Sequence, residues 1–269
     1  MCLSCFISSK SDAGLKFSGR TVPMNCPFLF HSRSPSMKSM FLRTLLVFSV
    51  LLAFTAVFPN AQVSTQAQDA PAADTLPAAN AEGWISLFNG KDLTGWKIPE
   101  FGGEGEVSIE NGIMTIGMGA MVSGIAWDGE FPFRSNYEIE VEASRTMGFD
   151  FYAAITFPVG EDGYCTFING GWGGSVFGLS CVNGFDASEN ETMQLIMTKN
   201  EQWNTFRVRV YDDRIEGWMD DKKVVDCPRA ENKFSTRFEV EYSQPLGVTN
   251  YCCETKLRSI RVRELKAEK

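Results

Sequence analysis

Apolar and polar residues alternate with a period of two at several places in the chain. In Tyr137–Ala143 the apolar side chains fall on one face of an extended segment and three glutamates fall on the other. The same alternation recurs in Phe206–Val210 and in Ile260–Arg263, where arginines take the polar positions. These patterns predict strands that bury one face and leave the other in water.

Further short apolar segments are separated by turn residues. Pairs such as Asn111-Gly112, Asp162-Gly163, Asn183-Gly184 and Asp220-Asp221 are typical of tight turns between strands. Strands are predicted at Ile85–Phe88, Val107–Glu110, Ile113–Ile116, Phe149–Phe157, Tyr164–Ile168, Val176–Val182, Arg214–Met219 and Phe238–Tyr242. No stretch shows a helical period, so the sequence predicts an all-β protein, an antiparallel β-sandwich.

The segment before this domain has the composition of an export signal. Residues 37–61 begin with the basic side chains of Lys38 and Arg43 and continue with an apolar core and then small and polar residues. The apolar run is shorter than the roughly 20 residues that cross a bilayer. We therefore expect a signal peptide, no membrane span after its removal, and a secreted or periplasmic product.

Two other segments flank the signal. Residues 1–36 precede Met37, a suitable start for the signal, and are interpreted as a misassigned N-terminal extension. Residues 62–82 are polar and nearly free of large apolar side chains, which predicts a disordered linker. The folded domain is expected at 83–266.

Charge and the lack of histidine exclude several functions. Without residues 1–61 the chain keeps 19 basic and 32 acidic residues, a net charge near −13, so nucleic acid is not expected as a partner. The only histidine, His31, lies in the segment that would be removed. Because Ser-His-Asp and Cys-His sites and most catalytic zinc sites need an imidazole, these classes are excluded.

Five cysteines lie in the predicted domain. Cys165 and Cys181 fall in neighbouring predicted strands and are candidates for a disulfide. Buried free thiols are an equally good interpretation, because cysteine packs readily in cores.

A tryptophan, Trp172, stands between two pairs of glycines in FINGGWGGSVFGLS. The run lacks the Gly-Lys-Ser/Thr of a P-loop and the third glycine of a dinucleotide fingerprint. Two interpretations stay open. The ring stacks on a sugar while the glycines allow a close approach, or it fills a gap between sheets beside a bulged strand.

Segments at both ends of the domain resemble a known family. GWISLFNGKDLTGWK (Gly83 to Lys97), EQWNTFRVRVYDDRIEGWMDDKKVVD (Glu201 to Asp226) and the closing strand from Leu257 to Leu265 are similar to parts of the 3-keto-disaccharide hydrolase domain family. The resemblance implies a concanavalin-like jelly roll, as in lectins and glucanases. It also implies hydrolysis of glycosidic bonds in 3-keto-disaccharides or related glycosides.

The middle of the domain departs from that family. Typical members have Asn-Ser-Gly before an apolar strand and a Tyr-Glu pair in the next one. Here FDFYAAITF and YCTFING take these places, so Asp150 stands near the asparagine and Cys165 near the glutamate. The missing carboxylate favours a second hypothesis, a carbohydrate-binding module of the cell envelope without catalysis. A structural or adhesive sandwich is a third.

Acids and aromatics near these middle strands are the candidate site residues. The candidates for general acid or base are Asp150 and Glu191. The candidates for substrate binding are Tyr152, Trp172, Asp186 and Glu189. A carbohydrate or glycoside is the expected ligand.

Two acidic clusters have other interpretations. The loop Asn183–Thr192 is rich in oxygen ligands and is a candidate calcium site, although a solvated acidic loop is favoured because no ligand spacing is met. No other metal or cofactor is predicted. The glutamates at 138, 140 and 142 have the alternate spacing of glucanase carboxylates, but an exposed outer face is favoured.

Overall fold

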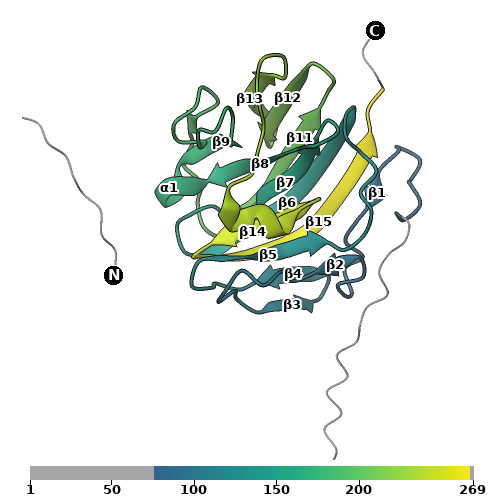
Figure 1. Cartoon of the computed structure of the whole chain (residues 1–269). Helices are drawn as coiled ribbons and strands as arrows, with labels where there is room; N and C mark the ends of the chain where they lie inside the picture. The colour runs from purple at the N-terminus through teal and green to yellow at the C-terminus, as the bar shows by residue number, and fades with distance from the viewer. Residues whose placement is uncertain (1–75, 267–269) are drawn as a thin grey trace, which may run out of the picture. The chain divides into compact units, whose positions relative to one another are not determined.

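The computed structural model describes residues 76–266, which form two antiparallel sheets stacked on one another (Figure 1). The predicted extension, signal peptide and most of the linker lie outside the described residues. The eight-stranded sheet runs in the order β13 (Lys222–Pro228), β12 (Arg214–Met219), β11 (Trp203–Val210), β6 (Tyr137–Met147), β15 (Glu254–Glu264), β4 (Ile113–Ile116), β3 (Val107–Glu110), and β1 (Ile85–Ser86) pairs with β15. The predicted β-sandwich is confirmed.

The second sheet has seven strands and carries the candidate site. Its order is β10 (Gln194–Leu195), β9 (Val176–Ser180), β8 (Gly163–Gly170), β7 (Ala154–Val159), β14 (Gly247–Tyr251), β5 (Val122–Trp127), β2 (Trp96–Lys97). A four-residue turn of helix, α1 (Gly171–Gly174), follows β8, and a 3-10 helix, η1 (Phe238–Ser243), precedes β14.

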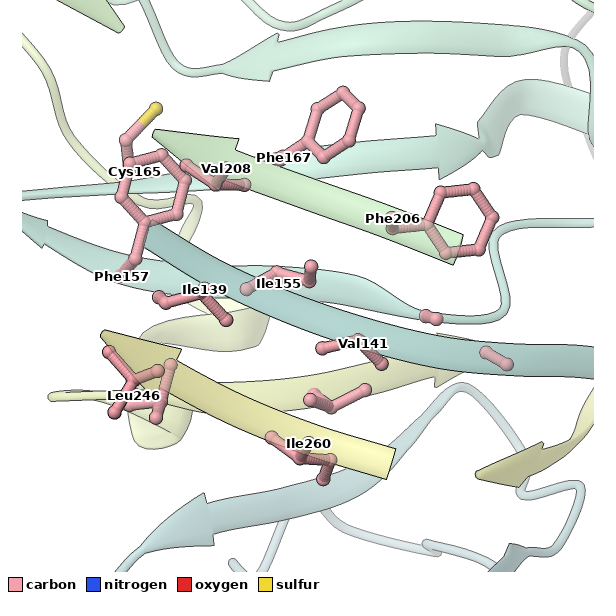
Figure 2. Close-up of a cluster of buried hydrophobic side chains, with 14 of the residues drawn as sticks. Ile139, Val141, Ile155, Phe157, Cys165, Phe167, Phe206, Val208, Leu246 and Ile260 are labelled. Carbon is pink, nitrogen blue, oxygen red and sulfur yellow. The ribbon is translucent and has the colours of Figure 1, made fainter. Parts of the chain in front are cut away.

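The core lies between the two sheets. Figure 2 shows Ile139, Val141, Phe206, Val208 and Ile260, from the eight-stranded sheet, packed with side chains of β7 and β8. Every labelled residue in that view is fully buried. The alternation in β6, β11 and β15 therefore directs every second side chain of these strands into the core.

Two regions differ from the predicted strands. Phe238–Tyr242 is the 3-10 helix η1 and not a strand. The buried residues of η1 are Val240 and Ser243, three apart as in a 3-10 helix, whereas Phe238 and Tyr242 are exposed. The alternation of apolar and polar residues in this segment therefore predicted a strand wrongly.

The second difference concerns strands whose two faces are both covered. β7 begins only at Ala154, so the predicted strand Phe149–Phe157 is half loop. β5 and most of β14 are buried on both faces and show no polar alternation, and they were not predicted.

The three glutamates of β6 lie on the outer face of the eight-stranded sheet, but two of them are not exposed. Glu138 and Glu140 are buried because arginines of the neighbouring strands cover them. The carboxylate of Glu138 accepts hydrogen bonds from Arg209 on β11 (3.1 Å) and Arg263 on β15 (2.7 Å). Glu140 is held in the same way by Arg207 and Arg261, both at 2.9 Å. These carboxylates are structural, and the predicted exposure is wrong for them.

The turn in the FNGKDLTGW motif is held by Asp92. Its Oδ1 accepts hydrogen bonds from the amide of Asn89 (2.7 Å) and from the hydroxyl of Thr94 (2.6 Å). These bonds, with the Thr94 hydroxyl contributing most, lower the pKa of Asp92 to about 2.

A pH dependence follows from Asp92. Because its folded pKa lies below the ordinary value of 3.8, the carboxylate stabilises the fold fully above about pH 4 and loses this effect as the pH falls towards 2. The side chain is exposed, so we expect Asp92→Asn to cost under about 1 kcal/mol at pH 7. Urea unfolding at pH 7 and pH 3 measures the difference. An equal cost at both values would contradict this role.

The five cysteines of the described region are free thiols, so Cys165 and Cys181 do not form a disulfide in this structure. Burial raises the pKa of Cys181, and it raises the pKa of Cys165 further still. Within residues 76–266, no helix is long and apolar enough to cross a membrane.

Candidate functional site

A cavity of about 250 Å³ opens on the outer face of the seven-stranded sheet. Thr166 and Ile168 of β8 and Ser180 of β9 form part of its floor. They alternate with core residues of the same strands, so they point away from the space between the sheets. Its walls are Met121, Val122, Asp150, Phe151, Trp172, Arg237, Glu239, Val240 and Tyr251.

Trp172 stands at one wall of the cavity because of the tight turn α1. The backbone is left-handed at Gly170 (φ 83°), at Trp172 (φ 48°) and at Gly174 (φ 102°). A Cβ at Gly174 would lie 2.5 Å from the carbonyl oxygen of Phe149, so only glycine fits there. The glycines thus turn the chain back on itself, and the indole at the tip stays 43% exposed. The interpretation of Trp172 as a buried wedge is wrong.

Asp150 lines the same cavity and is fixed to that turn. Its Oδ2 accepts a hydrogen bond from the backbone N–H of Gly173 (2.9 Å), and its Oδ1 accepts one from the N–H of Phe151 (2.8 Å). A carboxylate has about four acceptor positions, so two remain for a ligand. Asp150 and Trp172 therefore line the same cavity, and the hydrogen bond from Gly173 to Asp150 ties the Asp150 loop to the turn that carries Trp172.

A charged group forms another wall. Arg237 donates to both carboxylate oxygens of Glu239, from Nε (3.0 Å) and Nη2 (2.7 Å), and its Nη1 donates to Asp186. These hydrogen bonds hold the pKa of the Glu239 carboxyl below its ordinary value of 4.5. Glu239 is therefore a charged wall of the cavity and not a proton donor at neutral pH.

A buried arginine supports the segment that carries Asp150. Arg145 of β6 is 4% exposed and donates from Nη1 to the carbonyl oxygen of Asp150 (2.9 Å) and from Nε to Asn200 (2.6 Å). Its guanidinium also lies 5.2 Å from the ring centre of Tyr152. Arg145 thus fixes the loop beneath the cavity to the opposite sheet.

The family of the chain is settled by a comparison with protein-family models. The model described as 3-keto-alpha-glucoside-1,2-lyase-like domain matches residues 83–263. The chain belongs to this family. The match confirms the resemblance drawn from the two ends of the domain. All residues that line the cavity lie within the matched range. A search of curated protein sequences gave no match.

Several solved structures are similar to this chain at low identity. A putative glycosyl hydrolase from Parabacteroides distasonis is 16% identical, with a TM-score of 0.45, over 71% of this chain and 100% of its own. A Crh5 transglycosylase in complex with NAG is 13% identical, with a TM-score of 0.49, over 71% and 88%. Carbohydrate-binding module CBM66 from Bacillus subtilis is 14% identical, with a TM-score of 0.42, over 64% and 98%.

The structure places the sequence candidates of this lyase-like domain in three groups. Asp150 and Trp172 line the cavity, and Asp186 lies behind its wall through Arg237. Glu189 and Glu191 are exposed on the following loop and do not line it.

Tyr152 forms the third group, and its predicted role in substrate binding is wrong. It is fully buried, packs on Phe206 at 5.5 Å between ring centres, and donates its hydroxyl to Asn204 (3.0 Å). It faces the core and not a sugar. The Tyr152→Phe variant is expected to lose about 1 kcal/mol of stability, from one buried hydrogen bond, and to keep ligand affinity. Calorimetry of unfolding and of binding measures both, and a loss of affinity at unchanged stability would contradict the core assignment.

The loop proposed for calcium is organised by its own side chains. The amide of Asn190 donates to three carbonyl oxygens, those of Leu179, Phe185 and Asp186. No three His, Cys, Asp or Glu side chains of the described region are grouped to hold a metal ion. The calcium site stays a prediction.

Sequence reasoning missed the charged wall. Arg237 and Glu239 flank or fall in a predicted strand, whereas in the structure the 3-10 helix η1 and the residue before it bring them to the cavity wall. The exposed rings of Phe149 (72%) and Phe238 (77%) adjoin wall residues in the chain.

Proposed function

We propose that the chain is an exported enzyme that cleaves the glycosidic bond of 3-keto-α-glucosides or related 3-keto-disaccharides in this cavity. The observation that carries the proposal is the Asp150 carboxylate, fixed beside the half-exposed ring of Trp172 in one cavity. The family description, which names a 1,2-lyase of 3-keto-α-glucosides, supports the substrate class.

The chemistry requires one base and no imidazole. A ketone at C3 of the sugar acidifies the hydrogen on C2. Asp150 removes this proton, a double bond forms between C1 and C2, and the bond between C1 and the glycosidic oxygen breaks. The leaving oxygen takes a proton from water, and Asp150 returns its proton to solvent. Addition of water across the new double bond then gives net hydrolysis.

The surrounding residues fit this role for Asp150. The N–H groups of Phe151 and Gly173 fix the carboxylate at 2.8 and 2.9 Å, so its remaining acceptor positions are oriented before the substrate arrives. Trp172 offers a flat apolar surface to the C–H face of a sugar ring. At about 250 Å³, the cavity has room for one sugar unit.

The experiment is turnover of a matched pair of substrates. Purified protein is incubated with a 3-keto-α-glucoside and with its unoxidised parent, and products are followed by NMR. The proposal predicts cleavage of the keto sugar and none of the parent. Equal cleavage of both would indicate an ordinary glycosidase, and cleavage of neither would overturn the proposal.

A carbohydrate-binding module is the second candidate, favoured by Cys165 at the place of the family's glutamate. Cys165 is fully buried in the core, so no carboxylate reaches the cavity from that position. Binding of a 3-keto-glucoside without any turnover would establish this alternative.

Trp172 is expected to matter for either function. Trp172→Ala should weaken glycoside binding at least about tenfold, because the stacking surface is lost. Its ring is half exposed, so the melting temperature should change by only a few degrees. Binding calorimetry and thermal unfolding test the two parts. Unchanged affinity with a large drop in melting temperature would assign the ring to packing.

Export is proposed on the signal-like segment at 37–61. Mass spectrometry of the protein recovered from cells of the source organism should find the chain starting after this segment. An intact N-terminus in the mature protein would contradict export.

A further inference from the structure

The charged wall has a consequence for the class of sugar that the cavity takes. Among the described residues that line it, Arg237 is the one cationic side chain. An arginine in a sugar site is the usual partner of a carboxylate, sulfate or phosphate group on the ligand. Whether Arg237 can serve in this way depends on what already occupies its guanidinium.

Three of the five N–H groups of the Arg237 guanidinium donate to carboxylates of the protein. Nε and Nη2 donate to the two oxygens of Glu239 at 3.0 and 2.7 Å, a bidentate pair. Nη1 donates to Asp186, whose other oxygen accepts a hydrogen bond from the hydroxyl of Ser180 (3.3 Å). Each nitrogen thus donates to a protein carboxylate, one N–H on Nη1 and one on Nη2 are left, and the positive charge is already balanced by Glu239 and Asp186.

The local charge is negative as well. With formal charges at pH 7, the lining residues Asp150, Glu239 and Arg237 sum to −1. Asp186 behind the wall adds −1 and Arg145 beneath the Asp150 loop adds +1, so the total remains −1. An anionic sugar would therefore meet a net negative charge in the cavity.

We propose that Glu239 is a specificity-determining residue: by pairing with Arg237 and cancelling its charge, it selects uncharged 3-keto-glycosides and disfavours sugars that carry a carboxylate. This inference rests on the proposed function, since it concerns the ligand of the same cavity. Asp186 supports the arrangement from behind, whereas Glu239 itself lines the cavity.

The Glu239→Gln variant tests the proposal. It keeps the size of the side chain but removes its charge and weakens its hold on Arg237. The probes are methyl 3-keto-α-glucoside and the matching uronate, in which a carboxylate replaces the C6 hydroxymethyl group. The wild-type protein should bind the neutral probe at least about tenfold more tightly, and the variant should reduce this ratio at least about fivefold.

Two further variants make the result specific. Glu189→Gln removes the same charge from the exposed loop outside the cavity, and it should leave the ratio unchanged. Adding Arg237→Gln to Glu239→Gln should abolish any gain in uronate binding, because the released guanidinium is then missing. Thermal unfolding of each variant confirms that it folds.

The outcomes separate this inference from the proposed function. Equal wild-type affinity for both probes, or an equal change of the ratio in Glu189→Gln, would overturn the specificity role and leave the proposed function standing. Binding of neither probe by the wild-type protein would overturn the proposed function, and this inference with it.

Discussion

The Asp150→Asn variant is expected to lose at least about 100-fold in turnover of a 3-keto-α-glucoside while it keeps the fold. The amide has nearly the same shape as the carboxylate but cannot take the C2 proton. Its single oxygen can accept only one of the two N–H groups that Asp150 now accepts, those of Phe151 and Gly173. We therefore expect a stability loss of about 1 kcal/mol beside the loss of activity.

Steady-state kinetics and thermal unfolding measure the two effects of Asp150→Asn. The matched control is Glu191→Gln, at the second acid that the sequence offered, which is exposed and does not line the cavity. The control should retain wild-type turnover. If Glu191→Gln lost activity and Asp150→Asn did not, the base would have to be placed on the loop instead.

The largest effect on stability is expected for Glu138→Ala. Glu138 of β6 stands directly opposite Arg209 on one neighbouring strand and Arg263 on the other. Its side chain is 1% exposed, and both arginines are about one-quarter to one-third exposed. Removal of the carboxylate takes the directly bonded counter-charge from both guanidinium groups, and Arg209 keeps a contact with Glu216 at 4.0 Å, so the change should cost about 3 kcal/mol.

For a domain of this size, such a loss lowers the melting temperature by roughly 10 °C. Glu142→Ala is the matched control on the same strand, because Glu142 and its partner Arg258 are 29% and 46% exposed. It should cost less than about 1 kcal/mol. Similar costs for the two variants would show that burial of the Glu138 pairs contributes nothing.

The strands were predictable wherever one face is buried and the other is exposed to solvent. β6, β11 and β15 alternate clearly, and the arginines of β11 and β15 already lie at the positions that pair with the glutamates of β6. Their burial was not predictable, because it depends on long arginine side chains that lie over the sheet. Strands such as β5, covered on both faces, carry no alternation to read.

The candidate site was predictable only in part. Asp150 and Trp172 stood out as an acid and an aromatic beside glycines, and the turn α1 brings them to one cavity. Tyr152 is two residues from Asp150, but it lies fully buried in the core and does not line the cavity. Arg237 and Glu239 are more than 60 residues away in the chain, and no local pattern links them to Asp150.

The central claim is that the cavity over β8 and β9 holds a 3-keto sugar with its C2 next to Asp150. A crystal structure of the Asp150→Asn variant soaked with a 3-keto-α-glucoside tests it most directly. We predict the sugar ring against Trp172, with C2 within about 3.5 Å of the side chain at position 150. A sugar bound elsewhere on the molecule, or one whose C2 faces away from that side chain, would contradict the account.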